Sequence, residues 1–109
     1  MARFMLLFVG LAAPERADDS QTRDYEAKWV DWMSGLAREG VLSSGGPFLA
    51  TGKRVDRDAA VDLDLNTIDI GGYALIDVAS IDDAAKIAEQ APHTALGGST
   101  IVRPIMQRG

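Results

Sequence analysis

The chain begins with an uninterrupted apolar segment, Phe4 to Val9, which ends just before Gly10. A short continuous apolar run of this kind is typical of a central strand that is covered on both faces. The following residues, 11–20, contain Pro14 and several turn-forming side chains. We therefore expect a strand followed by a loop.

The pattern changes to helical spacing from Gln21 to about Glu39. Apolar and aromatic side chains recur there at intervals of three and four residues, which places them on one face of an α-helix. Ser20 or Thr22 can cap the start of this helix, and Gly40 suits its end. The predicted apolar face consists of Tyr25, Trp29, Trp32, Met33 and Leu36.

The middle of the chain predicts three further strands. Residues 41–55 form a broken strand, with a turn or bulge at the glycines of Gly45-Gly46-Pro47. Residues 60–65 alternate strictly between apolar and polar, as a half-buried strand does. Residues 70–78 form the third strand, which is entered through Gly71-Gly72. The paired glycines suit bulges and close backbone approach.

A second helix and a last strand complete the pattern. Ser80 can cap the helix, and Pro92 ends it. The predicted packing face is narrow and made of small residues. The last strand, residues 99–106, contains Pro104, and proline within a strand indicates an edge position or a bulge. The narrow packing face predicted for the second helix consists of Ile81, Ala84, Ala85 and Ala88.

The element order is thus β-α-β-β-β-α-β. With the middle hairpin treated as an embellishment, this order predicts a single α+β domain over residues 1–109 with a ferredoxin-like arrangement. Two helices would cover one face of a mostly antiparallel, five-strand sheet. The other face would stay open, and a domain of this size gains stability by burying it against a second copy. We therefore expect a homodimer.

Composition excludes several classes of function. The formal net charge is −5 and the basic residues are scattered, so nucleic-acid binding is not expected. The chain has no cysteine and one histidine, which argues against disulfides, thiolate chemistry and a transition-metal site. Its apolar runs are too short to span a membrane. The prediction is a cytoplasmic protein without a cofactor.

Candidate chemistry centres on His93, the single histidine, which can act as a general acid or base if it lines a cleft. The alternative is a loop histidine with a structural hydrogen bond. Asp77 shares a strand face with Tyr73 and Leu75. A raised pKa there would mark a site, whereas an ion pair with Arg103 or another cation would make Asp77 structural.

Two further groups are candidates for ligand contact. Lys53 and Arg54, which follow Phe48, can hold an anion at the mouth of a cleft, although a solvated hairpin explains them equally well. Trp29 and Trp32 are neighbours on the first helix. Core packing is the favoured interpretation of the two tryptophans, and an aromatic wall for a planar ligand is the alternative.

Several stretches together resemble the YCII-related (DGPF-domain) family, in the family's order and over nearly the whole chain. A shorter subgroup of that family shares three additional elements. The family stretches are Phe4–Gly10, Gly71–Val78, Ser80–Ala84, Gly97–Ser99 and Val102–Ile105; the subgroup elements are Gly45–Phe48, Gly52-Lys53 and Pro92-His93 ahead of Gly97-Gly98.

This resemblance implies a dimeric α+β barrel with a cleft between sheet and helices, and in some members a link to sigma factors. The chain also departs from the family pattern. Residues 62–67 lack the Asp-Gly-Pro-Phe motif, and Ala91 stands before Pro92 where founding-type members carry an aspartate. The first helix has no histidine, so the dyad of that branch is not transferred. Ile101 replaces a glutamate found in many relatives.

Three functions follow from these observations. The first is a dimeric small-molecule-binding domain with a cleft near His93. The second is a cofactor-independent enzyme, similar to isomerases, lyases or monooxygenases, with His93 as the acid or base and Asp77 or Arg103 assisting. The third is an interaction module that works with a sigma factor or another transcription regulator. The expected ligand contacts are Phe48, Lys53, Trp29, Tyr73 and Arg103.

Overall fold

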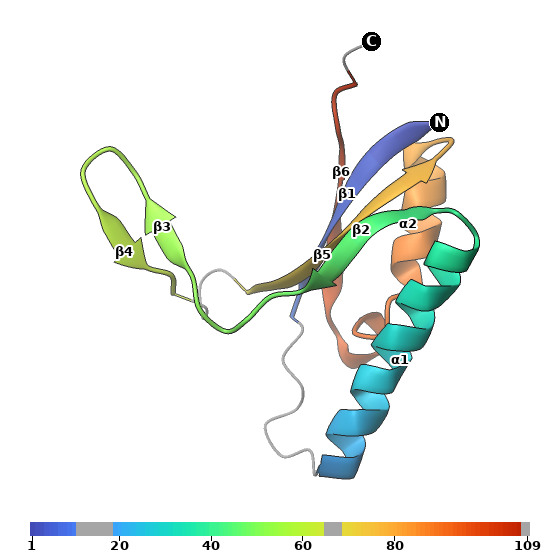
Figure 1. Ribbon diagram of the computed structural model, residues 1–109, viewed down its shortest axis with the longest axis horizontal. Helices are drawn as coiled ribbons and strands as arrows, with labels where there is room; N and C mark the ends of the chain where they lie inside the picture. Colours follow the sequence, from blue (N-terminus) through green and yellow to red (C-terminus); the bar gives the residue numbers. More distant parts are fainter. Residues whose placement is uncertain (11–18, 65–68, 108–109) are drawn as a thin grey trace.

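The computed structural model describes residues 1–10, 19–64 and 69–107 (Figure 1). Most of the predicted loop over residues 11–20 lies outside these ranges. In chain order the described elements are β1 (Ala2–Val9), α1 (Asp19–Arg38), β2 (Leu42–Pro47), β3 (Lys53–Val55), β4 (Ala60–Asp62), β5 (Ile70–Val78), α2 (Ile81–Glu89), the 3-10 turn η1 (Thr94–Leu96) and β6 (Ser99–Pro104).

The main sheet has the strand order β2-β5-β1-β6, and each neighbouring pair is antiparallel. Because α1 links β1 to β2 across the intervening β5, the chain forms the split arrangement of a ferredoxin-like α+β fold. This part of the prediction is confirmed. Pro104 also lies in an edge strand, as expected, because an edge position tolerates the missing N–H group.

The expected five-strand sheet is wrong in one respect. The strand predicted over residues 41–55 is divided into β2 and β3, and β3 pairs with β4 in a separate two-stranded ribbon. The main sheet therefore has four strands. The division falls at Pro47, which has no N–H group with which to continue a ladder.

Strict alternation along β1 and β5 gives the sheet two different sides. Phe4, Leu6, Ala74 and Ile76 are almost completely buried and form the core with the helices. The side chains between them are half-buried and lie on the opposite side, which we call the open face. The open face includes Arg3, Met5, Leu7, Tyr73, Leu75, Asp77, Ile101 and Arg103, which are joined in directly opposed pairs along the three strands.

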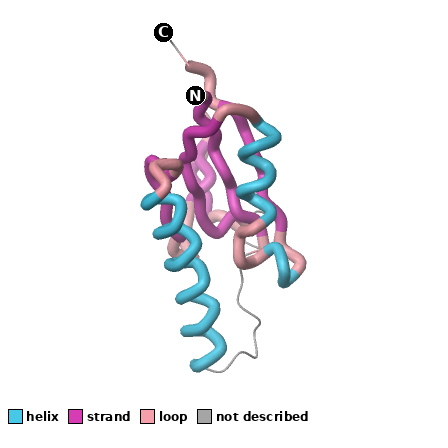
Figure 2. The backbone as a smooth tube through the Cα atoms, turned by 90° about the vertical axis from the view of Figure 1, so that its right-hand side faces the viewer, coloured by secondary structure: helices cyan, strands magenta, loops and turns pink. Residues whose placement is uncertain are grey.

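Both helices cover the same side of the sheet (Figure 2). The predicted face of α1 packs against the core, with Leu36 buried. The predicted face of α2 is only partly right. Ala84 and Ala88 are buried, but Ile81 is 48% exposed, and Ile87 packs against the core instead. The two alanines bring α2 close to the sheet, and this contact rotates Ile81 towards solvent.

Local signals at the ends of elements behave as predicted. The Ser80 hydroxyl accepts a hydrogen bond from the backbone N–H of Asp83, 3.1 Å away, and caps α2. Gly40 has a φ of 74° just beyond α1, a conformation that favours glycine. A Cβ on Gly72 would lie 2.9 Å from the backbone oxygen of Gly46, so close approach of β2 and β5 requires glycine there.

Candidate functional site

His93 lies in the core between the end of α2 and η1, and it is fully buried. Its Nε2 atom is 2.7 Å from the carbonyl oxygen of Ser99, with the hydroxyl of Thr100 at 3.4 Å. A carbonyl can only accept a hydrogen bond, so Nε2 carries the proton in the neutral ring. The Nδ1 atom is then a bare acceptor, and it has no partner among the described residues.

The turn that holds His93 depends on glycine. The N–H group of Gly98 donates to the carbonyl of His93 at 2.9 Å, and Gly97 has a φ of 91°. A Cβ on Gly98 would lie 2.5 Å from Cδ2 of His93 and 2.9 Å from the carbonyl oxygen of Val9. The Gly97-Gly98 pair therefore allows the imidazole to pack against the backbone next to β1.

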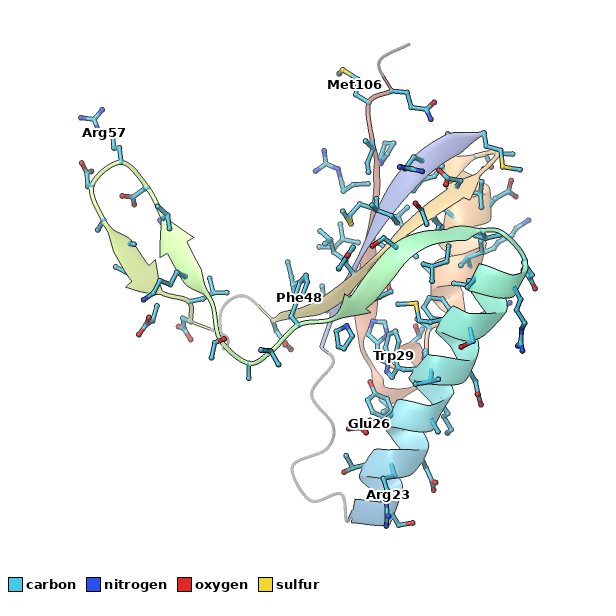
Figure 3. The ribbon with its side chains drawn as sticks, in the orientation of Figure 1. Arg23, Glu26, Trp29, Phe48, Arg57 and Met106 are labelled. Atoms are coloured by element: carbon cyan, nitrogen blue, oxygen red, sulfur yellow. The ribbon has the colours of Figure 1, made fainter. Side chains whose placement is uncertain are left out.

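Aromatic rings surround the imidazole. Trp29 is central, because its ring lies 5.2 Å from His93, 4.9 Å from Phe8 and 6.4 Å from Tyr25. Figure 3 shows Trp29 pointing from α1 towards the sheet. The hydroxyl oxygen of Tyr25 is buried and, like His93 Nδ1, lacks a hydrogen-bond partner among the described residues. We call Phe8, Tyr25, Trp29, Trp32 and His93 the aromatic cluster.

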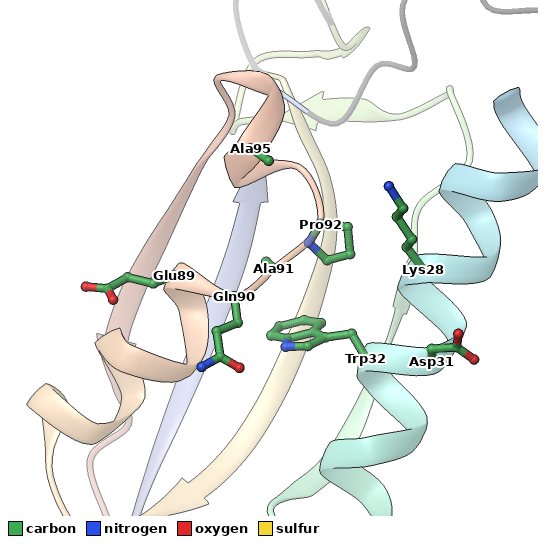
Figure 4. A pocket seen from close by; sticks show the side chains of 8 residues that line it. All are labelled: Lys28, Asp31, Trp32, Glu89, Gln90, Ala91, Pro92 and Ala95. Carbon is green, nitrogen blue, oxygen red and sulfur yellow. The ribbon is translucent and has the colours of Figure 1, made fainter.

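A groove of about 400 Å³ runs beside this cluster, between α1 and the end of α2 (Figure 4). The indole of Trp32 forms one wall of the groove, and its ring is 5.7 Å from that of Trp29. The groove therefore borders the aromatic cluster through Trp32. Its lining combines opposite charges with apolar surface: Lys28, Asp31, Trp32, Glu89, Gln90, Ala91, Pro92 and Ala95.

The other predicted site residues lie on the opposite side of the sheet. Asp77 forms an ion pair with Arg3 rather than with Arg103, at 2.9 Å from Nε to Oδ1. The guanidinium of Arg3 lowers the pKa of Asp77, mainly through their hydrogen bond, against a smaller opposing effect of burial. Arg103 lies on β6 directly opposite Met5. Neither Asp77 nor Arg103 shares a site with His93 within one chain.

Phe48 and Tyr73 form a second aromatic contact on the open face, with stacked rings 5.8 Å apart. The hydroxyl of Tyr73 is hydrogen-bonded to that of Ser44 at 2.8 Å. Lys53 lies on the separate ribbon, where it pairs with Asp62 at 2.8 Å, and both side chains are exposed to solvent. The structure thus brings together His93 with Trp29, and Phe48 with Tyr73, on different sides of the sheet.

Sequence reasoning missed the buried hydroxyl of Tyr25 and the polar lining of the groove. A signal for both was present, because Lys28 and Trp32 follow Tyr25 by three and seven residues and so share its side of α1. Arg3 was also missed as the partner of Asp77. No local pattern identifies that pair, since the two residues are 74 positions apart.

The fold and the aromatic cluster together define a small ferredoxin-like α+β domain with a buried histidine beside an interhelical groove. The model of the YCII-related domain matches residues 5–107, and the chain belongs to that family. Ala91, where the family resemblance places an aspartate in founding-type members, lines the groove. A comparison with curated proteins found no match.

One solved structure that matches is the 5-chloro-2-hydroxyhydroquinone dehydrochlorinase from Burkholderia phenoliruptrix AC1100, in complex with 2,5-dihydroxybenzoquinone. It is 23% identical, with a TM-score of 0.58, and the match covers 98% of this chain and 95% of that chain. This likeness shows a shared fold. Among the described residues no helix is long and apolar enough to cross a membrane.

Proposed function

We propose that this protein binds a small planar molecule that carries hydroxyl or carbonyl groups, at the aromatic cluster. The observation that carries the proposal is the pair of buried polar atoms, Nδ1 of His93 and the hydroxyl of Tyr25, without partners among the described residues. A buried polar atom without a partner costs about 1–3 kcal/mol. A ligand with a donor for Nδ1 and an acceptor for the tyrosine hydroxyl removes both costs.

Two features support this class of ligand. The rings of Trp29 and Trp32 offer flat apolar surface beside the polar atoms, as sites for planar molecules do. The groove next to them has a volume suited to a small ligand. The dehydrochlorinase of the same fold was solved with 2,5-dihydroxybenzoquinone, a flat ring that bears oxygen substituents. That compound is therefore a suitable first probe.

A second candidate function is cofactor-independent catalysis, and the position of the proton on His93 favours it. With Nε2 donating to Ser99, the free lone pair on Nδ1 is arranged to take a proton from a hydroxyl or an acidic C–H group. The resulting imidazolium keeps its hydrogen bond to the Ser99 carbonyl. Asp77 and Arg103 take no part in this scheme within one chain, because they lie beyond the sheet.

We also propose that the protein is a homodimer formed through the open face. Met5, Leu7 and Leu75 are half-buried there, and Ile101 is 44% exposed. No helix covers this side of the sheet in the described residues. A second copy would bury the apolar side chains that a single chain leaves in contact with water.

Titration with 2,5-dihydroxybenzoquinone, followed by NMR of the indole N–H signals of Trp29 and Trp32, tests the ligand site. Tyr25→Phe removes the buried hydroxyl, and we expect binding to weaken about 10-fold. Tyr73→Phe is the matched control, because that hydroxyl lies on the open face, and it should leave binding unchanged. His93→Gln should weaken binding similarly and, if the protein is an enzyme, abolish turnover.

The reverse result would place the ligand elsewhere. If Tyr73→Phe weakens binding and Tyr25→Phe does not, the ligand lies on the open face beside Phe48. If neither indole N–H signal changes its chemical shift at millimolar concentrations of 2,5-dihydroxybenzoquinone, the aromatic cluster does not bind this class of molecule.

A further inference from the structure

The β3–β4 ribbon projects from the body of the protein as an arm (Figure 1). We define the arm as residues 49–64. Its two strands are joined by three opposed residue pairs, and its turn is closed by hydrogen bonds from the backbone N–H groups of Asp58 and Ala59 to the Asp56 carboxylate. The arm is therefore a defined ribbon, even though it lies outside the main sheet.

The rest of the chain provides almost no support for this ribbon. Among the described elements β3 and β4 pack on each other, and neither makes more than marginal contact with another helix or strand. Three of its large apolar side chains are mostly in water, since Leu49 is 86%, Val55 72% and Val61 52% exposed. An isolated two-stranded hairpin is at best marginally stable in water. An ordered arm therefore needs a surface that its own chain does not supply.

The dimensions of the chain lead to the same conclusion. Its radius of gyration is 15.2 Å, compared with about 13 Å for a compact domain of this length. Its accessible surface is 7848 Å², compared with about 5,800 Å² for a folded monomer of this mass. The excess of about 2,000 Å² falls within the range of about 1,000–2,500 Å² that each chain of an obligate homodimer buries.

The direction of the arm indicates where the missing surface lies. The arm leaves the ends of β2 and β5 on the side of the sheet away from the helices (Figure 1). This is the side of the open face, and Phe48 stacks on Tyr73 at the base of the arm. A molecule that sat on the open face would meet the arm beside it.

We propose that the arm clasps a second copy of this chain that packs on the open face. The inference rests on the proposed homodimer and adds to it a second contact region, formed by residues far from the sheet. Each copy brings both an open face and an arm, so a two-fold arrangement buries both arms at once. One geometry thus accounts for the arm, the open face and the excess of exposed surface.

The chemistry of the arm fits a copy of this chain better than a highly charged partner. Its three basic and four acidic side chains nearly cancel, and most are paired within the arm or bonded at its turn. Val55 and Val61 supply apolar contact surface on its two sides. A partly apolar ribbon without excess positive charge suits a protein surface such as the open face and is poorly suited to a nucleic acid.

Cross-linking from the tip of the arm tests the proposal, and the absence of cysteine makes the chemistry selective. Arg57→Cys in the full chain carries a benzophenone label at the tip, where the side chain is 94% exposed (Figure 3). Chains with natural ¹⁴N that carry benzophenone are mixed with ¹⁵N chains that carry none. The mixture is left until subunits have exchanged and is then irradiated. We expect cross-linked peptides that join the two isotopes. Glu26→Cys, at an exposed position on α1, is the matched control and should give none.

A second variant measures the contribution of the arm to assembly. Val55→Asp should raise the dimer dissociation constant at least 10-fold in sedimentation, while Arg57→Ser, at the solvated tip, should change it less than 2-fold. If the wild type sediments only as a monomer, the homodimer and the arm contact both fail. If it is a dimer that Val55→Asp leaves unchanged, and the tip cross-links only within its own chain, the arm contact fails and the open-face dimer stands.

Discussion

Arg3 and Asp77 stand directly opposite each other on β1 and β5 and form an ion pair with two hydrogen bonds, Nε to Oδ1 at 2.9 Å and Nη2 to Oδ2 at 3.1 Å. Both side chains lie on the open face, and each is partly exposed. Bidentate pairing of this kind fixes the orientation of both groups. A general acid in a cleft would have a raised pKa, whereas Arg3 lowers the pKa of Asp77.

This pair predicts a stability that depends on pH. The pKa of Asp77 lies below its ordinary value of 3.8 in the folded protein, so the pair stabilises the fold above that value. The contribution is lost as the pH falls from about 4 through the lowered pKa. Asp77→Asn should therefore be less stable than the wild type at pH 7, and the difference should disappear under acid conditions.

Urea unfolding at a series of pH values between 7 and 2 measures this difference. Asp58→Asn is the control, because its ion pair with Arg57 is 3.6 Å long and almost fully exposed, and such pairs contribute little. A constant gap between wild type and Asp77→Asn at every pH would contradict the assignment to the ionised carboxylate.

Gly98 should be intolerant of a side chain. Gly98→Ala places a Cβ within 3 Å of both the imidazole of His93 and the backbone of Val9, so we expect a loss of about 1–3 kcal/mol. Gly35→Ala is the matched substitution in α1, where a Cβ meets nothing within 4 Å. It should increase stability by about 0.5–1 kcal/mol. Chemical denaturation of both variants gives the comparison, and equal stability of Gly98→Ala and wild type would disprove the close packing of His93.

The cap of α2 predicts a smaller effect. Ser80→Ala removes the acceptor for the backbone N–H of Asp83, which should cost about 1 kcal/mol. Ser34→Ala, at an exposed position within α1, should be neutral or slightly stabilising because alanine is the better helix former. Thermal unfolding followed by circular dichroism distinguishes the two. A Ser80→Ala protein as stable as Ser34→Ala would show that the cap contributes nothing.

The open face predicts how assembly responds to charge. Leu7 lies there between Tyr73 and Ile101. Leu7→Glu should convert the dimer into a folded monomer in sedimentation at micromolar concentration, with an unchanged far-ultraviolet spectrum. Val30→Glu is the control, since Val30 is 63% exposed on α1. Dissociation by Val30→Glu, with Leu7→Glu still dimeric, would move the interface to the helical side.

Sequence periodicity determined which side chains share a face within each element. The aromatic face of α1 and the alternation of β5 were both visible in the spacing of residues, because 3.6 and 2 residues per repeat are properties of the local backbone. The cap at Ser80 and the edge position of the Pro104 strand were also predictable. Each depends on a hydrogen bond that the residue itself can or cannot make.

Only the tertiary structure decided on which side of the sheet each face lies. His93 and Asp77, predicted as one site, are separated by the sheet, and Asp77 meets Arg3 from the other end of the chain. The number of strands in the main sheet was decided there too, because β3 and β4 form a separate two-stranded sheet and leave four strands where five were expected. Periodicity describes neighbours along one element, whereas contacts between distant elements depend on how complete surfaces fit together.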